Sequence, residues 1–299
     1  MAVSLLLVAA CSRRQAPLPA AEPRNDVYYW RTDLRLDSLE RVFLKRYDIG
    51  KVYCRYFDVV MQEGEPMPNA TITFSDTLPP GVELVPTVYI TEDCMHEHHE
   101  GLAAKLVRRI CQMHETNDLA PFGELQIDCD YTARSRQTYY AFLTEVKQAL
   151  TALPAACFGH PSPGQPHPSP LLSTTIRLHQ LSMAAPPADY GVLMLYNTGD
   201  PQRFTERNPI LDMRDVQPYL RHLAGYPLPL AAAYPVFTWV RTISGVRVEH
   251  AAEAAEVLRV KQAVEQRRPE LRQQILTYHL DKENIKRYTP ESYEKIYRH

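Results

Sequence analysis

The sequence predicts one (β/α)8 barrel, the TIM-barrel fold, and three observations favour it. About eight strand-like segments alternate with helical segments along the chain. Polar residues follow the ends of many of these strands rather than one pair of them. The chain has 299 residues, and such a barrel needs roughly 250. A doubly wound open sheet predicts the same alternation, but its polar residues would gather near one switch point.

The first half of the chain carries strand and helix signals in alternation. Strands are expected at residues 26–32, 51–60, 82–91 and 124–132, which are rich in β-branched and aromatic side chains. Asp37 is expected to cap a helix that Gly50 ends. Apolar residues at helical spacing predict two further helices, within residues 102–113 and 139–150.

The second half continues this alternation after a surface loop rich in Pro, Gly and His, residues 157–170. Strands are expected at residues 172–180, 190–197, 228–238 and 274–281. Helices are expected at residues 215–223, 251–266 and 290–297. Eight strands separated by helices predict a parallel sheet that closes into a barrel.

Composition excludes several classes of protein. The chain has 45% hydrophobic and 23% charged residues, which excludes wholesale disorder. Its formal net charge of -2 argues against a nucleic-acid binder with a broad basic surface. Only 11 glycines are present, and neither GxGxxG nor GxxxxGK[ST] occurs, so we expect no nucleotide cofactor and name no other.

The first residues read as an export signal. Residues 4–10 are apolar and too few to span a bilayer, which takes about 20 such residues, but they suit the hydrophobic part of a signal peptide. Residues 8–11 (VAAC) resemble the lipobox of bacterial lipoproteins, although residues 1–3 lack the usual Lys or Arg. The resemblance implies that Cys11 is lipidated and becomes the first residue of the mature protein.

This resemblance implies a domain organisation and a location. Residues 1–11 would be the signal peptide, residues 12–25 a Pro-rich tether and residues 26–299 the barrel. The protein would be held in the bacterial cell envelope through its lipid anchor, on the periplasmic or surface face of the outer membrane. No other segment is long and apolar enough to cross a membrane.

The cysteines are expected to be free rather than paired. They are Cys11, Cys54, Cys94, Cys111, Cys129 and Cys157. Lipidation of the first leaves an odd number with no CxxC pair, and Cys54 and Cys129 fall in predicted core strands. We therefore expect buried thiols and no disulfide scaffold.

A barrel places its site where strands end and βα-loops begin. The predicted strand ends carry Arg31, Arg55, Asp58, Glu92, Asp93, Asp128, Asp130, Arg177, His179, Tyr196, Asn197, Trp239 and Asp281. Since alternate residues of a strand share a face, Asp128 and Asp130 should point the same way, as should Arg177 and His179. Two adjacent carboxylates need a shared proton or a cation, which Arg55 or Arg177 could supply. We expect a charged pocket for a polar ligand, and a buried ion-pair network is the alternative.

Two of these strand ends carry a family resemblance. Residues 127–132 (IDCDYT) resemble the fourth-strand motif DxxDxDxE of family 18 glycoside hydrolases, and residues 193–197 (LMLYN) are similar to their sixth-strand Met-x-Tyr-Asp. Trp239 is similar to their floor tryptophan, which lies on strand eight in that family. Residues 26–299 also look like an uncharacterised family of exported barrel lipoproteins of Bacteroides-type organisms. These resemblances imply a barrel that recognises carbohydrate at its mouth.

The chain departs from family 18 at the residues that perform its chemistry. Thr132 replaces the general-acid Glu, Leu125 the first Asp of the motif, and Asn197 the Asp of Met-x-Tyr-Asp. A threonine hydroxyl cannot protonate a glycosidic oxygen near neutral pH. Hydrolysis would need another carboxyl pair about 5–9.5 Å apart, with Asp128 or Asp130 on one side. The candidates for the other side are Glu92, Asp58 and Asp281.

The sequence therefore predicts a lipid-anchored barrel that recognises a carbohydrate at its C-terminal mouth. The catalytic candidates are Asp128, Asp130 and Glu92, and the ligand-binding candidates are Arg31, Arg55, Asp58, Arg177, His179, Tyr196, Asn197, Trp239 and Asp281. Aromatic stacking on sugar rings is expected from Tyr29, Trp30, Tyr196, Phe237 and Trp239. The first hypothesis is a glycoside hydrolase that uses a carboxyl pair other than that of family 18. A catalytically silent glycan binder and a structural surface lipoprotein are the alternatives. The expected partners are a carbohydrate and the membrane, and the oligomeric state stays open.

A histidine-rich segment needs a separate interpretation. Residues 94–100 (CMHEHHE) combine a thiol, three histidines and two acids, which are zinc ligands by type. Their spacing fits neither HExxH nor a zinc finger. We expect a solvated helix start and no metal.

Overall fold

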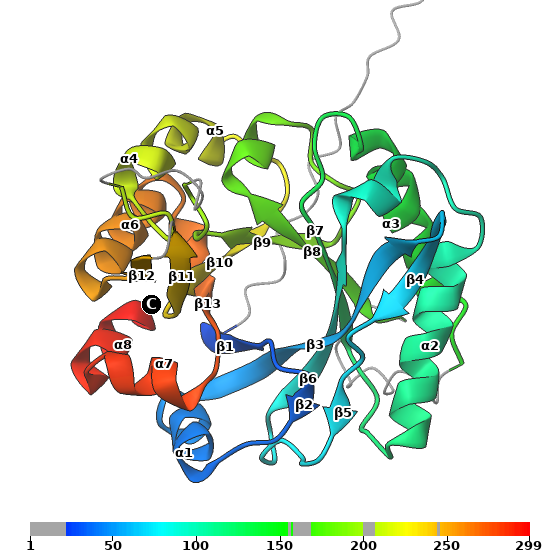
Figure 1. Ribbon diagram of the computed structural model, residues 1–299, viewed down its shortest axis with the longest axis horizontal. Coiled ribbons are helices and arrows are strands. Elements are labelled where there is room, and N and C mark those ends of the chain that lie inside the picture. The colour runs from blue at the N-terminus through cyan, green and yellow to red at the C-terminus, as the bar shows by residue number, and fades with distance from the viewer. Residues whose placement is uncertain (1–21, 155–156, 158–168, 200–206, 244–245) are drawn as a thin grey trace, which may run out of the picture.

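The sheet of this protein closes on itself. The computed structural model describes residues 22–154, 157, 169–199, 207–243 and 246–299 (Figure 1). β1 (Arg24–Tyr29) pairs in parallel with β3 (Ile49–Gln62) on one side and with β13 (Gln274–Tyr278) on the other. Between them lie β6 (Glu83–Ile90), β7 (Glu124–Cys129), β8 (Leu171–Arg177), β9 (Tyr190–Met194) and β10 (Leu230–Pro235). The (β/α)8 barrel is confirmed, and the open sheet is excluded.

Helices surround this ring of strands (Figure 1). The longer ones are α1 (Ser38–Arg46), α2 (Leu102–Thr116), α3 (Arg136–Thr151) and α6 (Ala254–Arg267). The shorter ones are α4 (Met213–Val216), α5 (Leu220–Leu223), α7 (Lys282–Arg287) and α8 (Pro290–Ile296). Asp37 caps α1 as predicted, accepting a hydrogen bond from the Glu40 amide. Gly50 does not end this helix, because Asp48, at φ 48°, already turns the chain into β3.

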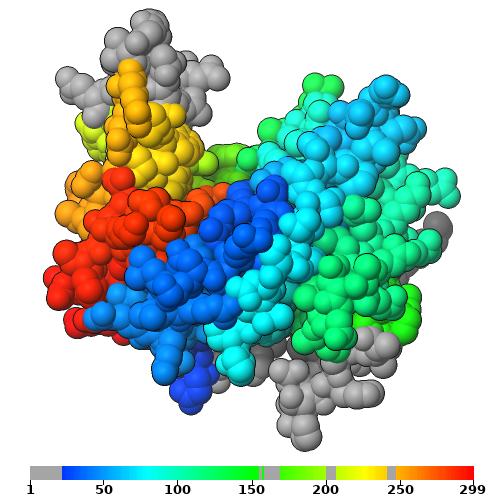
Figure 2. All heavy atoms as spheres, turned by 60° about the horizontal axis from the view of Figure 1, so that its bottom comes forward, coloured from blue at the N-terminus to red at the C-terminus, as the bar shows by residue number. Residues whose placement is uncertain are grey.

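Two hairpins that the sequence did not predict rise from the carboxyl end of the barrel. β3 continues beyond the ring and pairs antiparallel with β4 (Glu65–Asn69). β11 (Thr238–Ile243) and β12 (Val246–Ala251) form the second hairpin, and β2 (Asp33–Leu34) pairs with β5 (Thr73–Phe74). Figure 2 shows the surface hollowed between the β11–β12 hairpin, in yellow and orange, and the β3–β4 hairpin, in blue and cyan.

Most of the predicted strands end earlier than expected, and for three of them this changes where predicted site residues lie. β10 ends at Pro235, so Trp239 belongs to the β11–β12 hairpin and not to the seventh barrel strand. β8 ends at Arg177, and the next residues form the 3-10 helix η2 (Leu178–Ser182). β9 ends at Met194. The prediction that Arg177 and His179 share a strand face is therefore wrong, because His179 lies on η2.

A buried polar network lies inside the barrel at the amino ends of the strands, which we call the lower half. It is centred on Glu124, the first residue of β7. Lys51 Nζ lies 2.7 Å from Glu124 Oε2, while the hydroxyls of Ser173 and Tyr190 each donate to Glu124 Oε1 at 2.5 Å. Glu124 is fully buried. Burial alone would raise the pKa of its carboxyl, but the Lys51 ammonium and the hydroxyl donors outweigh that effect and hold the pKa below its usual value.

Asp26 of β1 belongs to the same network. Its Oδ2 accepts a hydrogen bond from Gln274 Nε2 at 2.8 Å and lies 3.2 Å from Arg24 Nε. Its Oδ1 is buried and has no hydrogen-bond partner among the described residues. Burial therefore raises the pKa of Asp26 to about 6, although Arg24 and Lys51 oppose the shift.

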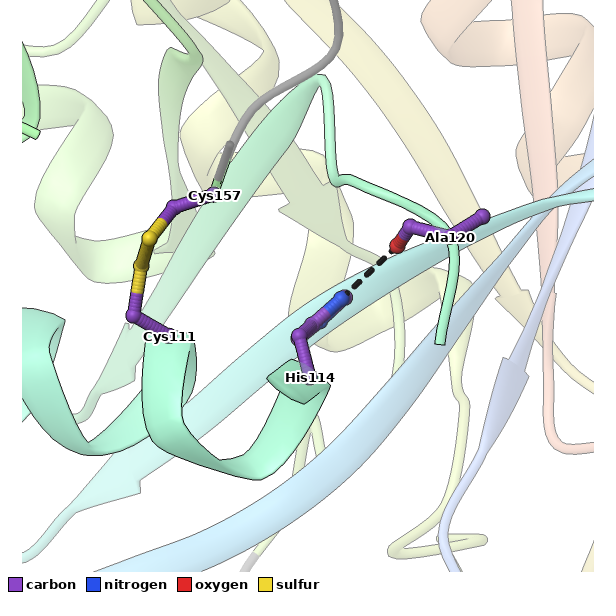
Figure 3. Close-up of a disulfide and its surroundings, with 4 residues drawn as sticks. All are labelled: Cys111, His114, Ala120 and Cys157. Carbon is purple, nitrogen blue, oxygen red and sulfur yellow. Dashed lines mark hydrogen bonds between the residues drawn. A yellow bond between two sulfur atoms is a disulfide. The ribbon is translucent and has the colours of Figure 1, made fainter. Parts of the chain in front are cut away.

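A disulfide links the outer layer of the barrel. Cys111 of α2 and Cys157, which follows α3, are bonded with a Cα–Cα distance of 5.5 Å (Figure 3). The prediction of free thiols is wrong for this pair, because α2 and α3 lie side by side and bring together residues far apart in the chain. It is confirmed for Cys54, Cys94 and Cys129, which are buried and free.

One helical turn beyond Cys111, His114 fastens α2 to the following loop (Figure 3). Its Nδ1 donates a hydrogen bond to the Ala120 carbonyl oxygen at 2.8 Å, and its Nε2 lies 2.9 Å from the Tyr56 hydroxyl. Burial lowers the pKa of His114, so this imidazole is neutral and structural.

The expected signal peptide, residues 1–11, lies outside the described residues, as do Cys11 and the tether up to residue 21. β1 begins at Arg24, two residues before the predicted start of the barrel. Among the helices that the structure describes, none has the length and apolarity needed to cross a membrane.

Candidate functional site

Arg177 joins the two predicted aspartates at the mouth of the barrel. It is the last residue of β8, beside Asp128 on the neighbouring strand β7, and Asp130 follows that strand directly. Its Nε donates to Asp130 Oδ1, and its Nη2 lies 3.4 Å from Asp128 Oδ1. Thr175 Oγ1 also donates to Asp128, at 2.6 Å. The predicted cationic partner is therefore present, and it is Arg177.

The two aspartates differ in their access to water. The Asp128 side chain is 5% exposed and that of Asp130 is 48% exposed. Burial raises the pKa of Asp128, and the Asp130 charge adds to the effect, while Arg177 opposes it. Only Asp130 presents its carboxylate to a ligand in the mouth. Asp128 acts on such a ligand through Arg177.

Arg55 does not reach this pair. It forms a two-pronged ion pair with Asp58, in which Nε donates to Oδ1 at 2.7 Å and Nη2 donates to Oδ2. A register irregularity in β3 between Arg55 and Phe57 allows the two side chains to meet. The guanidinium carbon also lies 5.9 Å from the Trp30 ring centroid. Arg55 therefore does not neutralise Asp128 and Asp130, and Arg177 is the cation that does.

A row of aromatic rings crosses the mouth. Tyr278, the last residue of β13, has its ring centroid 5.5 Å from that of Trp30 and 5.5 Å from that of Phe237. Phe237 lies 5.8 Å from Trp239 on the β11–β12 hairpin. We call Trp30, Tyr278, Phe237 and Trp239 the aromatic row. It runs from the end of β1 to the wall of the hollow in Figure 2.

Tyr196 connects the aromatic row to the charged cluster. Its ring centroid lies 4.6 Å from that of Tyr278, and the Arg177 guanidinium carbon lies 5.5 Å from the Tyr196 centroid. Rings beside fixed charges and hydrogen-bond donors are the surfaces on which sugars bind, since a sugar has apolar faces and a polar rim. The mouth therefore places ring faces next to charged groups.

Glu92 lies next to Thr132, the residue that stands where family 18 enzymes have their acid. Thr132 Oγ1 donates to Glu92 Oε1 at 2.9 Å, and His96 Nε2 lies 2.6 Å from Glu92 Oε2. Burial would raise the pKa of Glu92, but hydrogen bonds from Ser135, Thr132 and His96 outweigh it and lower the pKa. Glu92 is therefore an ionised carboxylate near neutral pH, which is the wrong state for a general acid.

Several predicted site residues are occupied elsewhere in the fold. Arg31 pairs with the buried Glu40 of α1 at 2.9 Å, and Asp281 caps α7 by accepting from the Glu283 amide at 2.8 Å. His179 is exposed on η2, and Asn197 is exposed at φ 54°. Tyr29 is buried and donates to the Asp33 carbonyl oxygen, so it packs in the core instead of facing the mouth.

Two histidines of this segment form separate hydrogen bonds to carboxylates. His96 meets Glu92, and His98 Nε2 lies 2.7 Å from Glu145 Oε1 on α3. Cys94 is buried, with its thiol 3.4 Å from the Thr91 hydroxyl. Within the part of the chain that the structure describes, no three His, Cys, Asp or Glu residues come together as metal ligands.

The sequence-based list omitted two residues that organise the mouth. Tyr278 contacts Trp30, Tyr196 and Phe237, and Thr175 holds Asp128. Tyr278 is the last residue of β13, the eighth strand of the ring. Placement at the end of the predicted strand 274–281 could have identified it, whereas a threonine inside a strand gives no such signal.

Comparison with known proteins finds the fold but no close relative. No family model matches the sequence, and no curated protein matches it. A chitinase from Bacteroides thetaiotaomicron has a TM-score of 0.56 at 9% identity, over 93% of this chain and 94% of that one. The spore cortex-lytic enzyme SleL of Bacillus cereus has a TM-score of 0.55 at 12% identity, over 92% and 74%. A xylanase and α-amylase inhibitor protein from Scadoxus multiflorus has a TM-score of 0.52 at 10% identity, over 92% and 98%.

At these identities the likeness shows a shared barrel fold and nothing finer. Two of the three proteins are enzymes by name and the third is an inhibitor. The shared fold alone therefore cannot decide between catalysis and binding, and the decision has to come from the site.

Proposed function

We propose that the mouth of this barrel binds an oligosaccharide without cleaving it. The observation that carries the proposal is the aromatic row, which continues into the Tyr196–Arg177–Asp130 cluster. The partly exposed rings of Trp30, Tyr278 and Trp239 would stack on sugar faces. Phe237 and Tyr196 are each 5% exposed, so the expectation that they stack on a sugar is wrong and they pack in the core that supports the exposed rings. Arg177 and Asp130 would donate to and accept from hydroxyl groups. The similarity to carbohydrate-active barrels supports the same class of ligand.

The state of the carboxyls argues against the hydrolytic chemistry. Asp130 and Asp58 are each bound to an arginine, and Glu92 is held ionised by its donors. Asp128, whose pKa is raised, is nearly sealed from the mouth. Glycoside hydrolysis needs a protonated carboxyl that touches the leaving oxygen. Asp128, the one of these four whose pKa is raised, lacks that access, and the carboxylates of Asp130 and Asp58 are held by arginines.

A binding experiment tests the proposal. Purified protein is screened against neutral and acidic oligosaccharides, and Trp239→Ala is compared with wild type by calorimetry. Loss of one stacking ring should weaken binding about fivefold to tenfold, from about 1 kcal/mol of stacking. Val240→Ala is the matched control, because Val240 follows on the same strand and is 50% exposed. Equal affinity of wild type and Trp239→Ala would contradict the role of the aromatic row.

A second candidate is hydrolysis, favoured by the position of Glu92 beside Thr132. Release of reducing ends from the same oligosaccharides measures it directly. Cleavage that is lost in both Glu92→Gln and Asp130→Asn would assign the reaction to this pair and overturn the silent-binder proposal. Binding without cleavage in the wild type would support it.

We also propose that the protein is exported and lipidated at Cys11 in the bacterial cell envelope. The Cys111–Cys157 disulfide supports export, because disulfides persist in oxidising compartments. Metabolic labelling with a fatty acid, with Cys11→Ala as the control, tests the anchor. Label that is absent from the wild type, or retained in the variant, would contradict lipidation at this residue.

A further inference from the structure

A pocket of about 680 Å³ lies beside the mouth, at the Trp30 end of the aromatic row. Its walls come from the segment that follows β1 and from Lys282 at the start of α7. We call it the Trp30 pocket, and the residues that define it are Trp30, Arg31, Asp33, Arg35, Asp37 and Lys282. The Trp30 indole is thus shared between this pocket and the mouth.

The two carboxylates of the Trp30 pocket are engaged by the protein itself. Asp33 accepts a hydrogen bond from Thr73 Oγ1 at 3.2 Å, and hydrogen bonds from Ser75 and Thr73 lower its pKa. Asp37 accepts from the Glu40 amide at 2.8 Å as the cap of α1. Because these carboxylate oxygens already accept hydrogen bonds from the protein, they have less capacity to bind a ligand.

The cations of the pocket are less committed. Arg31 is neutralised by the buried Glu40, but Lys282 forms no hydrogen bond or ion pair with the described residues. Arg35 is 73% exposed and approaches Asp33 only to 3.5 Å. Lys282 and Arg35 therefore bring donors without full partners to one pocket, and a ligand anion could occupy them.

We propose that the Trp30 pocket binds an acidic sugar unit, so that the oligosaccharide held across the mouth is an anionic one. The sugar ring stacks on Trp30, and its carboxylate or sulfate accepts hydrogen bonds from Arg35 and Lys282. This inference rests on the proposed carbohydrate-binding function and specifies its ligand class. It places the charged unit at the β1–α7 side of the hollow and neutral units towards the β11–β12 hairpin.

Matched probes test the ligand class. Cellohexaose and its C6-oxidised form share one backbone and differ by a carboxylate on each sugar, while oligogalacturonate and hyaluronan hexasaccharides add other carboxylate backbones. A chondroitin sulfate hexasaccharide distinguishes sulfate from carboxylate. Wild type should bind at least one acidic probe ten times or more tightly than the neutral hexamer, and the preference should shrink as salt is added.

Variants separate this inference from the function on which it rests. Arg35→Gln with Lys282→Gln should weaken acidic binding at least tenfold and change neutral binding less than twofold. Lys286→Gln on the same helix is the control, since Lys286 pairs with Glu283 outside the pocket. Binding of neutral probes only, or acidic binding that the double variant retains, would overturn the acidic-sugar inference alone. Failure of all probes to bind would overturn the carbohydrate proposal itself.

Discussion

The barrel interior contains two carboxylate–cation clusters that look alike as residues and differ in their access to water. In the lower cluster Lys51 and Glu124 form a buried ion pair, with Glu124 fully enclosed and satisfied by hydroxyl donors. In the upper cluster Arg177 joins Asp128 to Asp130, which is 48% exposed. Charge pairing at a strand therefore does not mark a functional site by itself. The two clusters differ in the exposure of Asp130 to the mouth and in its position beside the aromatic row.

The largest expected effect lies in the lower cluster. Lys51→Met leaves the Glu124 charge buried without its counter-ion and should lower the free energy of unfolding by about 3 to 5 kcal/mol in urea denaturation. Arg177→Met should cost less, because water reaches Asp130 and Asp128 can take up a proton. Replacing both Lys51 and Glu124 by apolar residues should recover most of the loss. A smaller loss of unfolding free energy for Lys51→Met than for Arg177→Met would contradict this difference between the two clusters.

The pH dependence of stability gives the next effect. The pKa of Asp26 is about 6 in the folded protein and 3.8 ordinarily, so the folded state holds this proton more tightly. Its contribution to stability is present below pH 3.8 and is lost as the pH rises through 6, by about 2 to 3 kcal/mol. Asp26→Asn should therefore gain stability relative to wild type between pH 4 and pH 7. If the urea midpoints of wild type and Asp26→Asn differ by the same amount at every pH in this range, the pKa of Asp26 is not shifted in the folded protein.

A matched pair on β8 compares the clusters directly. Ser173 donates to Glu124 and Thr175, two residues later, donates to Asp128. Ser173→Ala should cost about 2 kcal/mol because no water can replace the donor. Thr175→Val should cost about 1 kcal/mol, since Arg177 also contacts Asp128 and the raised pKa of Asp128 lets its carboxyl take up a proton. Equal costs in chemical denaturation would mean that both clusters are equally sealed.

The smallest effect on stability is expected at Asp130. Asp130→Asn should change the free energy of unfolding by less than about 0.5 kcal/mol, because the side chain is largely exposed. The same change should weaken oligosaccharide binding severalfold, since it removes the charge opposite Arg177. A variant that loses stability but keeps its affinity would place Asp130 with the structural cluster.

The sequence predicted the barrel because its signals are local. Apolar and β-branched runs marked all eight ring strands, and Asp37 marked the start of α1. The β11–β12 hairpin was not predicted. Only Val236 and Phe237 separate β10 from β11, so the apolar run from residue 228 resembles one continuous strand. The disulfide was not predicted because its cysteines are 46 positions apart and are brought together only by helix packing.

The site could be predicted only where one strand carried it. The spacing of Asp128 and Asp130 indicated the mouth, and Arg177 was among the available cations. The pairing of Lys51 with Glu124 depends on strands β3 and β7, which β6 separates, so their contact requires the register of the closed ring. No local pattern could show which carboxylate is sealed and which is exposed.

The direction of β1 has a consequence for how the protein presents its mouth. Arg24 begins this strand at the amino end of the ring, while Trp30 follows its carboxyl end at the mouth. A chain anchored through Cys11, as proposed, would thus be attached from beneath the ring. The hollow would then lie at the end of the barrel opposite the point of attachment.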